Sequence, residues 1–193
     1  MEEPIETSDE DLRALVERAR GGDEVAFGTL VTANYEPVFR LVYSIVRNEH
    51  DARDVCQEIW IAAWRAIGTF RGDAKLTTWL HPIAVRRSID HLRGRKRWVA
   101  RFLPFLSSDG MEAPGADESP DPRETAEATE RTQRFERAIA SLPPKHRAVL
   151  ALREIEGLSY EEIAKTMKLR PGTVMSRLHN ARRLLVRKIG DAP

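Results

Sequence analysis

Apolar residues recur along most of this chain three and four positions apart, which is the spacing of one face of an α-helix. The pattern predicts helices over residues 11–20, 24–47, 48–67, 77–97, 125–141 and 145–155. Two further helices are predicted near the C-terminus, one beginning at Tyr160 and ending before Leu169, the other over residues 173–189. Pro37 falls inside the second segment, so we expect either a kink or two helices there. The sequence therefore predicts an all-α protein.

The helical pattern stops between residues 107 and 127. This segment is rich in proline, glycine and acidic residues and holds no aromatic residue. It cannot bury enough apolar surface to fold by itself, so we expect a flexible acidic linker. The linker separates two small helical domains, residues 23–106 and 128–193, and residues 1–22 form an acidic N-terminal segment with a short helix. The linker is either an inert tether or a segment that occupies a basic channel normally filled by nucleic acid.

The segment from Leu158 to Lys188 has the signals of a helix-turn-helix. Ser159 and Glu162 have the spacing of a capping box, which places the start of a helix at Tyr160. Pro171 and Gly172 prevent that helix from continuing. In a helix-turn-helix the second helix usually contacts the major groove. Polar side chains that suit base edges and phosphates lie on the face of this second helix opposite its apolar one: Thr173, Ser176, Arg177, Asn180 and Arg183.

Charge is distributed very unevenly, although the net charge is only +1. Acidic residues crowd the first eleven positions and residues 109–130, whereas basic residues crowd residues 86–101 and 165–188. No acidic residue lies between Glu162 and Asp191. Two separate basic segments indicate a polyanion contacted at two places. The alternative is that residues 158–188 form an ordinary basic helical hairpin with a solvated face. The helix cap, the break between the helices, the positive charge and the polar face together favour nucleic-acid binding.

Trp60 and Trp64 are spaced i, i+4 in the predicted helix 48–67, beside a stripe that holds Asp54, Gln57 and Glu58. Two interpretations are equally supported by these residues alone. Both tryptophans belong to the core, or they anchor a docking surface for another protein.

Several classes of protein are disfavoured. The single cysteine, Cys56, excludes an internal disulfide and a cysteine-cluster zinc site, and its apolar neighbours predict a buried side chain. We find no phosphate-binding loop, no metal-ligand spacing and no nucleophile with its base, so neither an enzyme nor a cofactor is expected. The five histidines are scattered singly. No apolar run approaches a membrane span, and a cytoplasmic protein without membrane insertion is expected.

The order of these features closely resembles the small bacterial sigma factors of the extracytoplasmic-function group. The resemblance extends from about Asp23 to Lys188, across the acidic linker. The motifs that carry it lie at residues 35–40, 51–58, 70–73, 78–80, 83–84, 90–93, 142–143, 157–164, 172–174 and 176–178.

The resemblance implies a transcription initiation factor that binds core RNA polymerase, directs it to specific promoters and helps melt the DNA. It implies docking on the beta-prime clamp helices and the beta flap of the polymerase. It also implies control by an anti-sigma factor in response to stress or envelope signals. The alternative is a two-domain regulator that binds DNA without polymerase, for which the docking stripe and the second basic helix would have no use.

The resemblance assigns residues to three surfaces. The residues expected at the minus-thirty-five element are Arg170, Thr173, Ser176, Arg177, Asn180 and Arg183. Those expected at the minus-ten element, where a flipped non-template base would enter a pocket near the loop, are Arg71, Lys75, Leu76, Thr77, Arg86, Arg87, Arg93 and Arg97. Those expected at core polymerase, where the resemblance favours the docking interpretation of the tryptophans, are Asp51, Asp54, Gln57, Glu58, Trp60 and Trp64.

Overall fold

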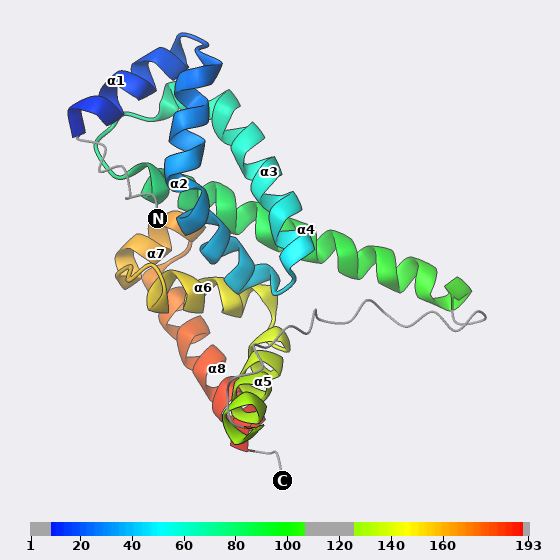
Figure 1. Cartoon of the computed structure of the whole chain (residues 1–193). Helices are drawn as coiled ribbons and strands as arrows, with labels where there is room; N and C mark the ends of the chain where they lie inside the picture. The colour runs from blue at the N-terminus through cyan, green and yellow to red at the C-terminus, as the bar shows by residue number, and fades with distance from the viewer. Residues whose placement is uncertain (1–8, 107–125, 191–193) are drawn as a thin grey trace.

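The computed structural model describes residues 9–106 and 126–190, and these residues form helices and no strand. The first domain consists of α1 (Asp9–Arg20), α2 (Glu24–Val46), α3 (Glu49–Ala66), the short 3₁₀ helix η1 (Ile67–Thr69) and α4 (Leu76–Leu106). The second consists of α5 (Ala126–Ala140), α6 (Pro144–Glu154), α7 (Tyr160–Met167) and α8 (Pro171–Gly190) (Figure 1). The predicted all-α fold with two helical domains is confirmed. Residues 107–125 of the predicted linker lie outside the described residues, as do residues 1–8 of the acidic segment.

Helix ends follow the local sequence signals. Asn48 caps α3 by accepting a hydrogen bond from the Asp51 backbone N–H at 2.8 Å, and Asp23 caps α2 in the same way through Ala26. α2 continues through Pro37 as a single helix. α8 begins at Pro171, two residues earlier than predicted, because proline is well suited to the first position of a helix. α4 extends beyond the predicted end at residue 97, since no glycine or proline interrupts residues 95–103.

The core of the first domain lies between α2, α3 and α4, which all contact one another. Cys56 is part of it, as predicted, and burial raises the pKa of its thiol to about 12. The thiol therefore stays protonated at neutral pH and serves as a small apolar side chain. The large fully buried side chains of this core come from all three helices: Leu30, Leu41, Ile45, Ile59 and Leu80.

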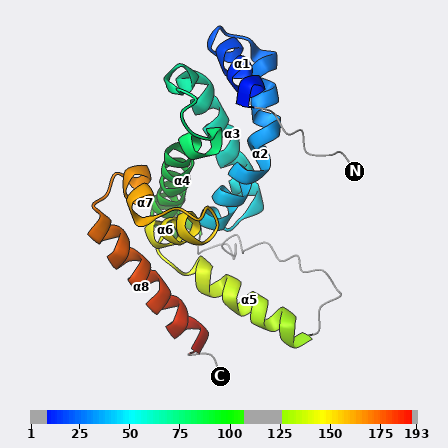
Figure 2. The same cartoon turned by 90° about the vertical axis from the view of Figure 1, so that its left-hand side faces the viewer.

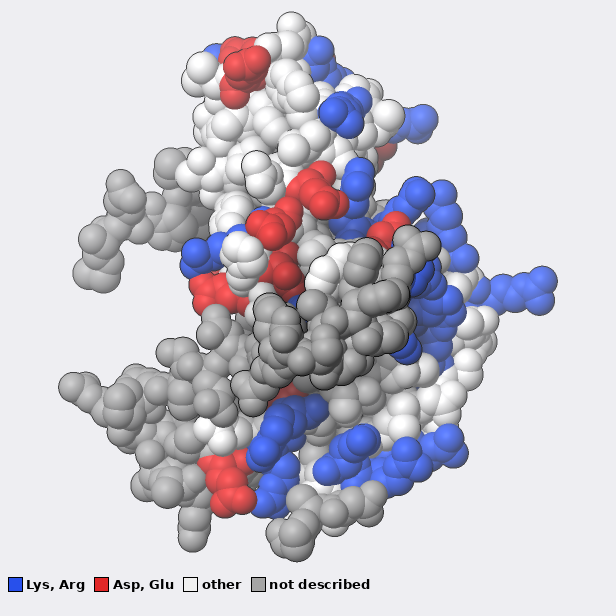
Figure 3. Space-filling model, turned by 90° about the vertical axis from the view of Figure 1, so that its right-hand side faces the viewer, with Lys and Arg blue, Asp and Glu red and all other residues white. Residues whose placement is uncertain are grey.

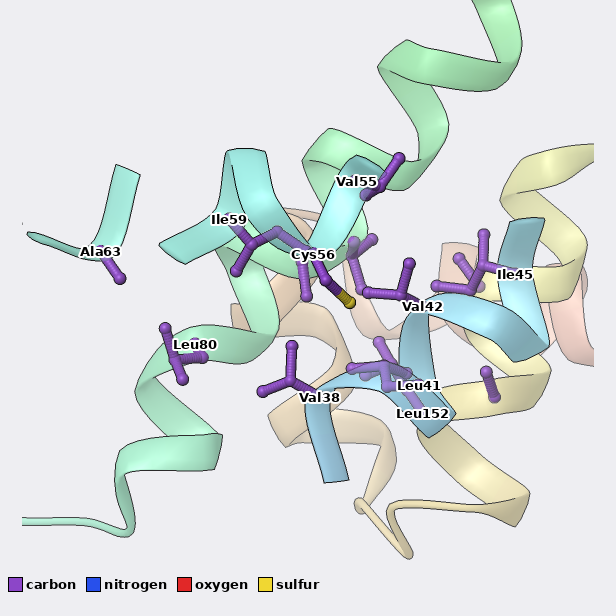
Figure 4. Packing of buried hydrophobic residues seen from close by; sticks show 14 of the residues in the cluster. Val38, Leu41, Val42, Ile45, Val55, Cys56, Ile59, Ala63, Leu80 and Leu152 are labelled. Atoms are coloured by element: carbon purple, nitrogen blue, oxygen red, sulfur yellow. The ribbon is translucent and has the colours of Figure 1, made fainter. Parts of the chain in front are cut away.

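The two domains pack against each other and share one apolar cluster. α6 contacts α2, and α6 and α7 contact α4 (Figure 2). Leu152 of α6 lies beside Val38 and Leu41 of α2 in the shared cluster (Figure 4). A polar pair, His81 of α4 and Glu156 after α6, crosses the same interface at 2.9 Å between Nε2 and Oε2.

Positive charge is buried at another part of this interface. Arg47, which ends α2 in the left-handed conformation with φ of 64°, forms an ion pair with Glu136 of α5. Arg147 of α6 is 6% exposed, and burial together with the charge of Arg47 lowers the pKa of its guanidinium to about 10. Arg147 therefore remains charged at neutral pH. Because burying a charge costs desolvation energy, the apolar contacts must offset this cost to keep the domains together.

Candidate nucleic-acid interface

The predicted helix-turn-helix is formed by α7 and α8. Its capping box is complete. The Ser159 backbone N–H donates to Glu162 Oε2 at 2.7 Å, and the Glu162 N–H donates to Ser159 Oγ at 3.2 Å. The hydrogen bond from the Ser159 backbone N–H, and after it the interaction with the Ser159 hydroxyl, lowers the pKa of the Glu162 carboxyl. α7 ends at Met167, and the capping residue Lys168 is left-handed with φ of 52°, where the chain turns towards α8. The cap and the break are both where the sequence predicted them.

The polar face of α8 is accessible in the structure. Val174, Leu178 and Ala181 are buried on the opposite side of the helix. Arg170, Ser176 and Arg183 are exposed, whereas Thr173, Arg177 and Asn180 are half-buried. The Ser176 hydroxyl donates to the Thr173 carbonyl at 3.1 Å, so part of its hydrogen-bonding capacity is used within the helix.

The second basic surface lies on α4 and on the loop before it. Arg71 and Lys75 of the loop and Arg86, Arg87, Arg93 and Arg97 of α4 are exposed, and Thr77 is half-buried. Asp90 lies 3.7 Å from Arg86 and 3.8 Å from Arg93. Leu76 is only 3% exposed and packs in the core, and it lines neither the groove between α4 and the helix-turn-helix nor the pocket beside the loop. We therefore correct its assignment from the minus-ten surface to the core.

A groove joins the two basic surfaces. It has a volume of about 880 Å³ and lies between α4 and the helix-turn-helix. A single acidic residue, Asp90, lines it, together with six cations: Arg86, Arg87 and Arg93 of the first domain and Lys145, Lys168 and Arg177 of the second. In Figure 3 lysine and arginine side chains gather along one flank of the molecule over both domains. The sequence predicted both surfaces but not that they share a groove.

The outer face of α3 carries an acidic stripe. Asp54, Gln57 and Glu58 are exposed, and Ile61 beside them is 48% exposed, a residue that the sequence analysis did not single out. Glu58 lies 3.5 Å from Arg87 of α4. Asp51 is different, because it is largely buried and pairs with Arg95 and His91 of α4. Asp51 therefore connects α3 to α4.

The two tryptophans of α3 pack inward. The ring centroid of Phe27 in α2 lies 6.2 Å from that of Trp60 and 4.9 Å from that of Trp64. Both ring pairs meet edge to face. Trp60 is 7% exposed, and Trp64 is partly buried against the core. The packing supports the core interpretation, and the place of both tryptophans in the docking surface stays a prediction. Helical spacing alone could not reveal this packing, because Phe27 comes from another helix.

Other kinds of site are absent from the described residues. Within residues 9–106 and 126–190, no group of three or more His, Cys, Asp or Glu side chains could hold a metal ion. None of the helices in these ranges is long and apolar enough to span a membrane. The surfaces that remain are the two basic ones and the acidic stripe.

Comparison with known proteins gives a consistent result. Residues 30–98 match the family described as sigma-70 region 2, and residues 132–185 match the family described as sigma-70, region 4. The chain is 38% identical to the RNA polymerase sigma-H factor of Pseudomonas aeruginosa, over 91% of this chain and 92% of that protein. It is also 38% identical to the ECF RNA polymerase sigma-E factor of Escherichia coli K12, over 92% of this chain and 93% of that protein.

Two solved structures share the fold. One is CnrH in complex with the cytosolic domain of CnrY, with a TM-score of 0.61 and 25% identity over 93% of this chain and 98% of that chain. The other is the sigma factor RpoE of Bartonella quintana in complex with the anti-sigma factor NepR, with a TM-score of 0.65 and 23% identity over 86% of this chain and 98% of that chain.

Proposed function

This chain belongs to the extracytoplasmic-function group of RNA polymerase sigma factors, and from this premise we propose which of its surfaces performs each step of promoter-directed initiation. As a transcription initiation factor it directs core polymerase to promoters and assists in melting them, and it performs no chemistry of its own. Its site of action is the cytoplasm, where bacterial polymerase and promoters are found.

The polar face of α8 contacts the minus-thirty-five element as duplex DNA. Arg177 and Arg183 lie on this face with Thr173 and Asn180, opposite the buried Val174 and Leu178. Cations of this kind neutralise phosphates and bind guanine edges, while hydroxyl and amide groups bind bases and phosphates. The capping box and the left-handed turn at Lys168 hold α7 and α8 in the orientation that this contact requires.

The loop from Arg71 to Lys75 and the basic face of α4 contact the minus-ten element. Extruding a base from the duplex costs a few kcal/mol of stacking and pairing, so the protein must offer a shaped pocket and nearby cations. A pocket of about 390 Å³ lies beside this loop, and Arg71 and Lys75 line it. Arg86, Arg87 and Arg93 supply positive charge further along α4.

The acidic stripe of α3 binds core polymerase. Asp54, Gln57 and Glu58 are the exposed members of the predicted docking set, and Ile61 adds apolar area next to them. We assign this stripe to the beta-prime clamp helices and the second domain to the beta flap. Asp51, Trp60 and Trp64 act indirectly, by fixing α3 against α4 and α2.

An anti-sigma factor regulates the protein. Both solved relatives are complexes, RpoE with the anti-sigma factor NepR and CnrH with the cytosolic domain of CnrY. In this chain part of each basic surface lines one groove, with Arg87 and Arg93 on one side and Arg177 on the other, so a single partner seated there contacts both at once. Stress or envelope signals would act by releasing that partner.

The observation that carries this proposal is the presence of two basic surfaces, one in each domain, in a chain that matches sigma factors over more than nine-tenths of its length. The test is run-off transcription with purified core polymerase and a library of promoters from the source genome. We expect specific transcripts from a subset of templates. If the protein leaves core polymerase unable to select any promoter, the proposal is wrong.

A further inference from the structure

The pocket beside the minus-ten loop has a second wall that the loop does not supply. Its lining combines residues 70–75 with α1, which contributes Leu12, Arg13, Val16, Glu17 and Arg20. α1 precedes residue 30, where the match to sigma-70 region 2 begins. The pocket therefore depends on a helix outside the matched part of the family.

α1 is firmly attached to the loop. Val16 and Ala19 are buried, and α1 contacts α2 and η1. The Arg20 guanidinium donates hydrogen bonds to the Phe70 carbonyl oxygen and to Glu17 Oε1. These bonds hold the Glu17 carboxylate at the pocket and leave its Oε2 as an acceptor.

The chemistry of the lining suits a nucleobase. Leu12 supplies partly accessible apolar surface, and Val16 and Phe70, which are 4% and 2% exposed, form the nearly buried part of the lining. Arg71 and Lys75 place positive charge on the loop, where the phosphates of an extruded nucleotide would lie. Glu17 and Asp73 add carboxylates, and a carboxylate accepts hydrogen bonds from an exocyclic amino group such as N4 of cytosine.

We propose that Glu17 of α1 binds the exocyclic amino group of an extruded non-template base in this pocket, which makes α1 a specificity element for the minus-ten region. Cytosine, adenine and guanine carry such an amino group, whereas thymine has only carbonyl oxygens, which the carboxylate would repel. This inference rests on the proposed function, because it names the group that selects the extruded base.

The test uses holoenzyme assembled from the full chain and core polymerase, on a promoter recovered by the run-off experiment. The non-template strand is changed one position at a time to each base. At the position where wild type requires an amino-bearing base, that base is then replaced by an analogue lacking the amino group: purine for adenine, 2-pyrimidinone for cytosine, hypoxanthine for guanine. The rate of open-complex formation is measured for wild type and for Glu17→Gln, which keeps the side-chain size and an oxygen to accept from Arg20.

Wild type is expected to lose about tenfold in rate on the analogue, the cost of one specific base contact, whereas Glu17→Gln is expected to be slow on both bases and insensitive to the analogue. The matched control is Glu24→Gln, an exposed acid at the start of α2 outside the pocket, which should behave as wild type. Competition for core polymerase verifies that each variant is folded.

Two outcomes would overturn the inference alone. In one, the analogue slows open-complex formation by the same factor for wild type and for Glu17→Gln, which would mean that another group binds the amino group. In the other, wild type discriminates at no amino-bearing position although it initiates specifically. A wild-type holoenzyme that initiates on no template instead contradicts the proposed function, so the two failures can be told apart.

Discussion

His81 and Glu156 come from different domains and are 75 residues apart in the chain, yet their side chains meet at 2.9 Å. The side chains are only 6% and 17% exposed, so the pair is largely shielded from water. Breaking a buried polar pair leaves one partner unsatisfied and costs roughly 1–3 kcal/mol. The relative position of the two domains therefore depends on this contact.

Replacing Glu156 with alanine is expected to loosen the domain interface without unfolding either domain, because it leaves His81 Nε2 without its partner. Small-angle scattering should give a larger radius of gyration for Glu156→Ala than for wild type, with unchanged helical circular dichroism. Glu161→Ala is the matched control, because Glu161 is exposed on α7. Identical scattering curves for wild type and Glu156→Ala would show that the pair does not hold the domains.

Removing the Arg177 side chain is expected to weaken promoter binding by about tenfold, in the range of one base or phosphate contact. Binding to core polymerase should not change. If Arg177 contacts a phosphate, the salt dependence of DNA binding should also fall by about one counterion. Arg182→Ala is the control on the same helix, since Arg182 pairs with Glu154 at 2.7 Å. Equal promoter affinity of Arg177→Ala and wild type would remove Arg177 from the site.

Reversing the charge of Asp54 should impair core binding and spare DNA binding. We expect Asp54→Lys to compete at least about tenfold less well for core polymerase, because a like charge is placed opposite a basic partner surface. Trp60→Phe serves for comparison. Its buried ring should affect thermal stability more than affinity. A competition assay that ranks Trp60→Phe below Asp54→Lys would contradict the placement of the docking surface on the acidic stripe.

The capping box gives the helix-turn-helix a defined response to acid. Because the pKa of Glu162 is lowered in the folded protein, its contribution to stability is present above about pH 4.5 and is lost as the pH falls through the folded pKa. Thermal unfolding of wild type should therefore approach that of Glu162→Gln as the pH is lowered below about 4.5. Ser159→Ala should lower stability at neutral pH by about 1 kcal/mol. A constant difference between wild type and Glu162→Gln across this pH range would be inconsistent with the cap.

Local features of this protein were predictable from sequence, and contacts between distant segments were not. Ser159 with Glu162, and Asn48 before α3, act on their own helix ends, so their roles follow from spacing alone. Val174 and Leu178 follow from helical periodicity in the same way. Trp60 was expected at core polymerase by resemblance, and its burial could not be foreseen because it depends on Phe27 of α2.

The same limit applies to the sites. Arg93 and Arg177 were both expected to contact DNA, but no local pattern places them in one groove. Nor does the sequence indicate that α1 lies beside Phe70, since this follows from the way α1 packs on α2 and η1. Leu76 was assigned to the minus-ten surface by resemblance, but in the structure its side chain is buried in the core.

The apolar cluster shared by Leu152, Val38 and Leu41 constrains how the protein changes partners. Separation of the domains exposes these side chains to water. An exposed apolar surface of this kind favours binding of another macromolecule that buries it again. A long-lived, solitary open form is therefore disfavoured. Transfer from inhibitor to polymerase should proceed by direct displacement, at a rate that rises with the concentration of the incoming molecule.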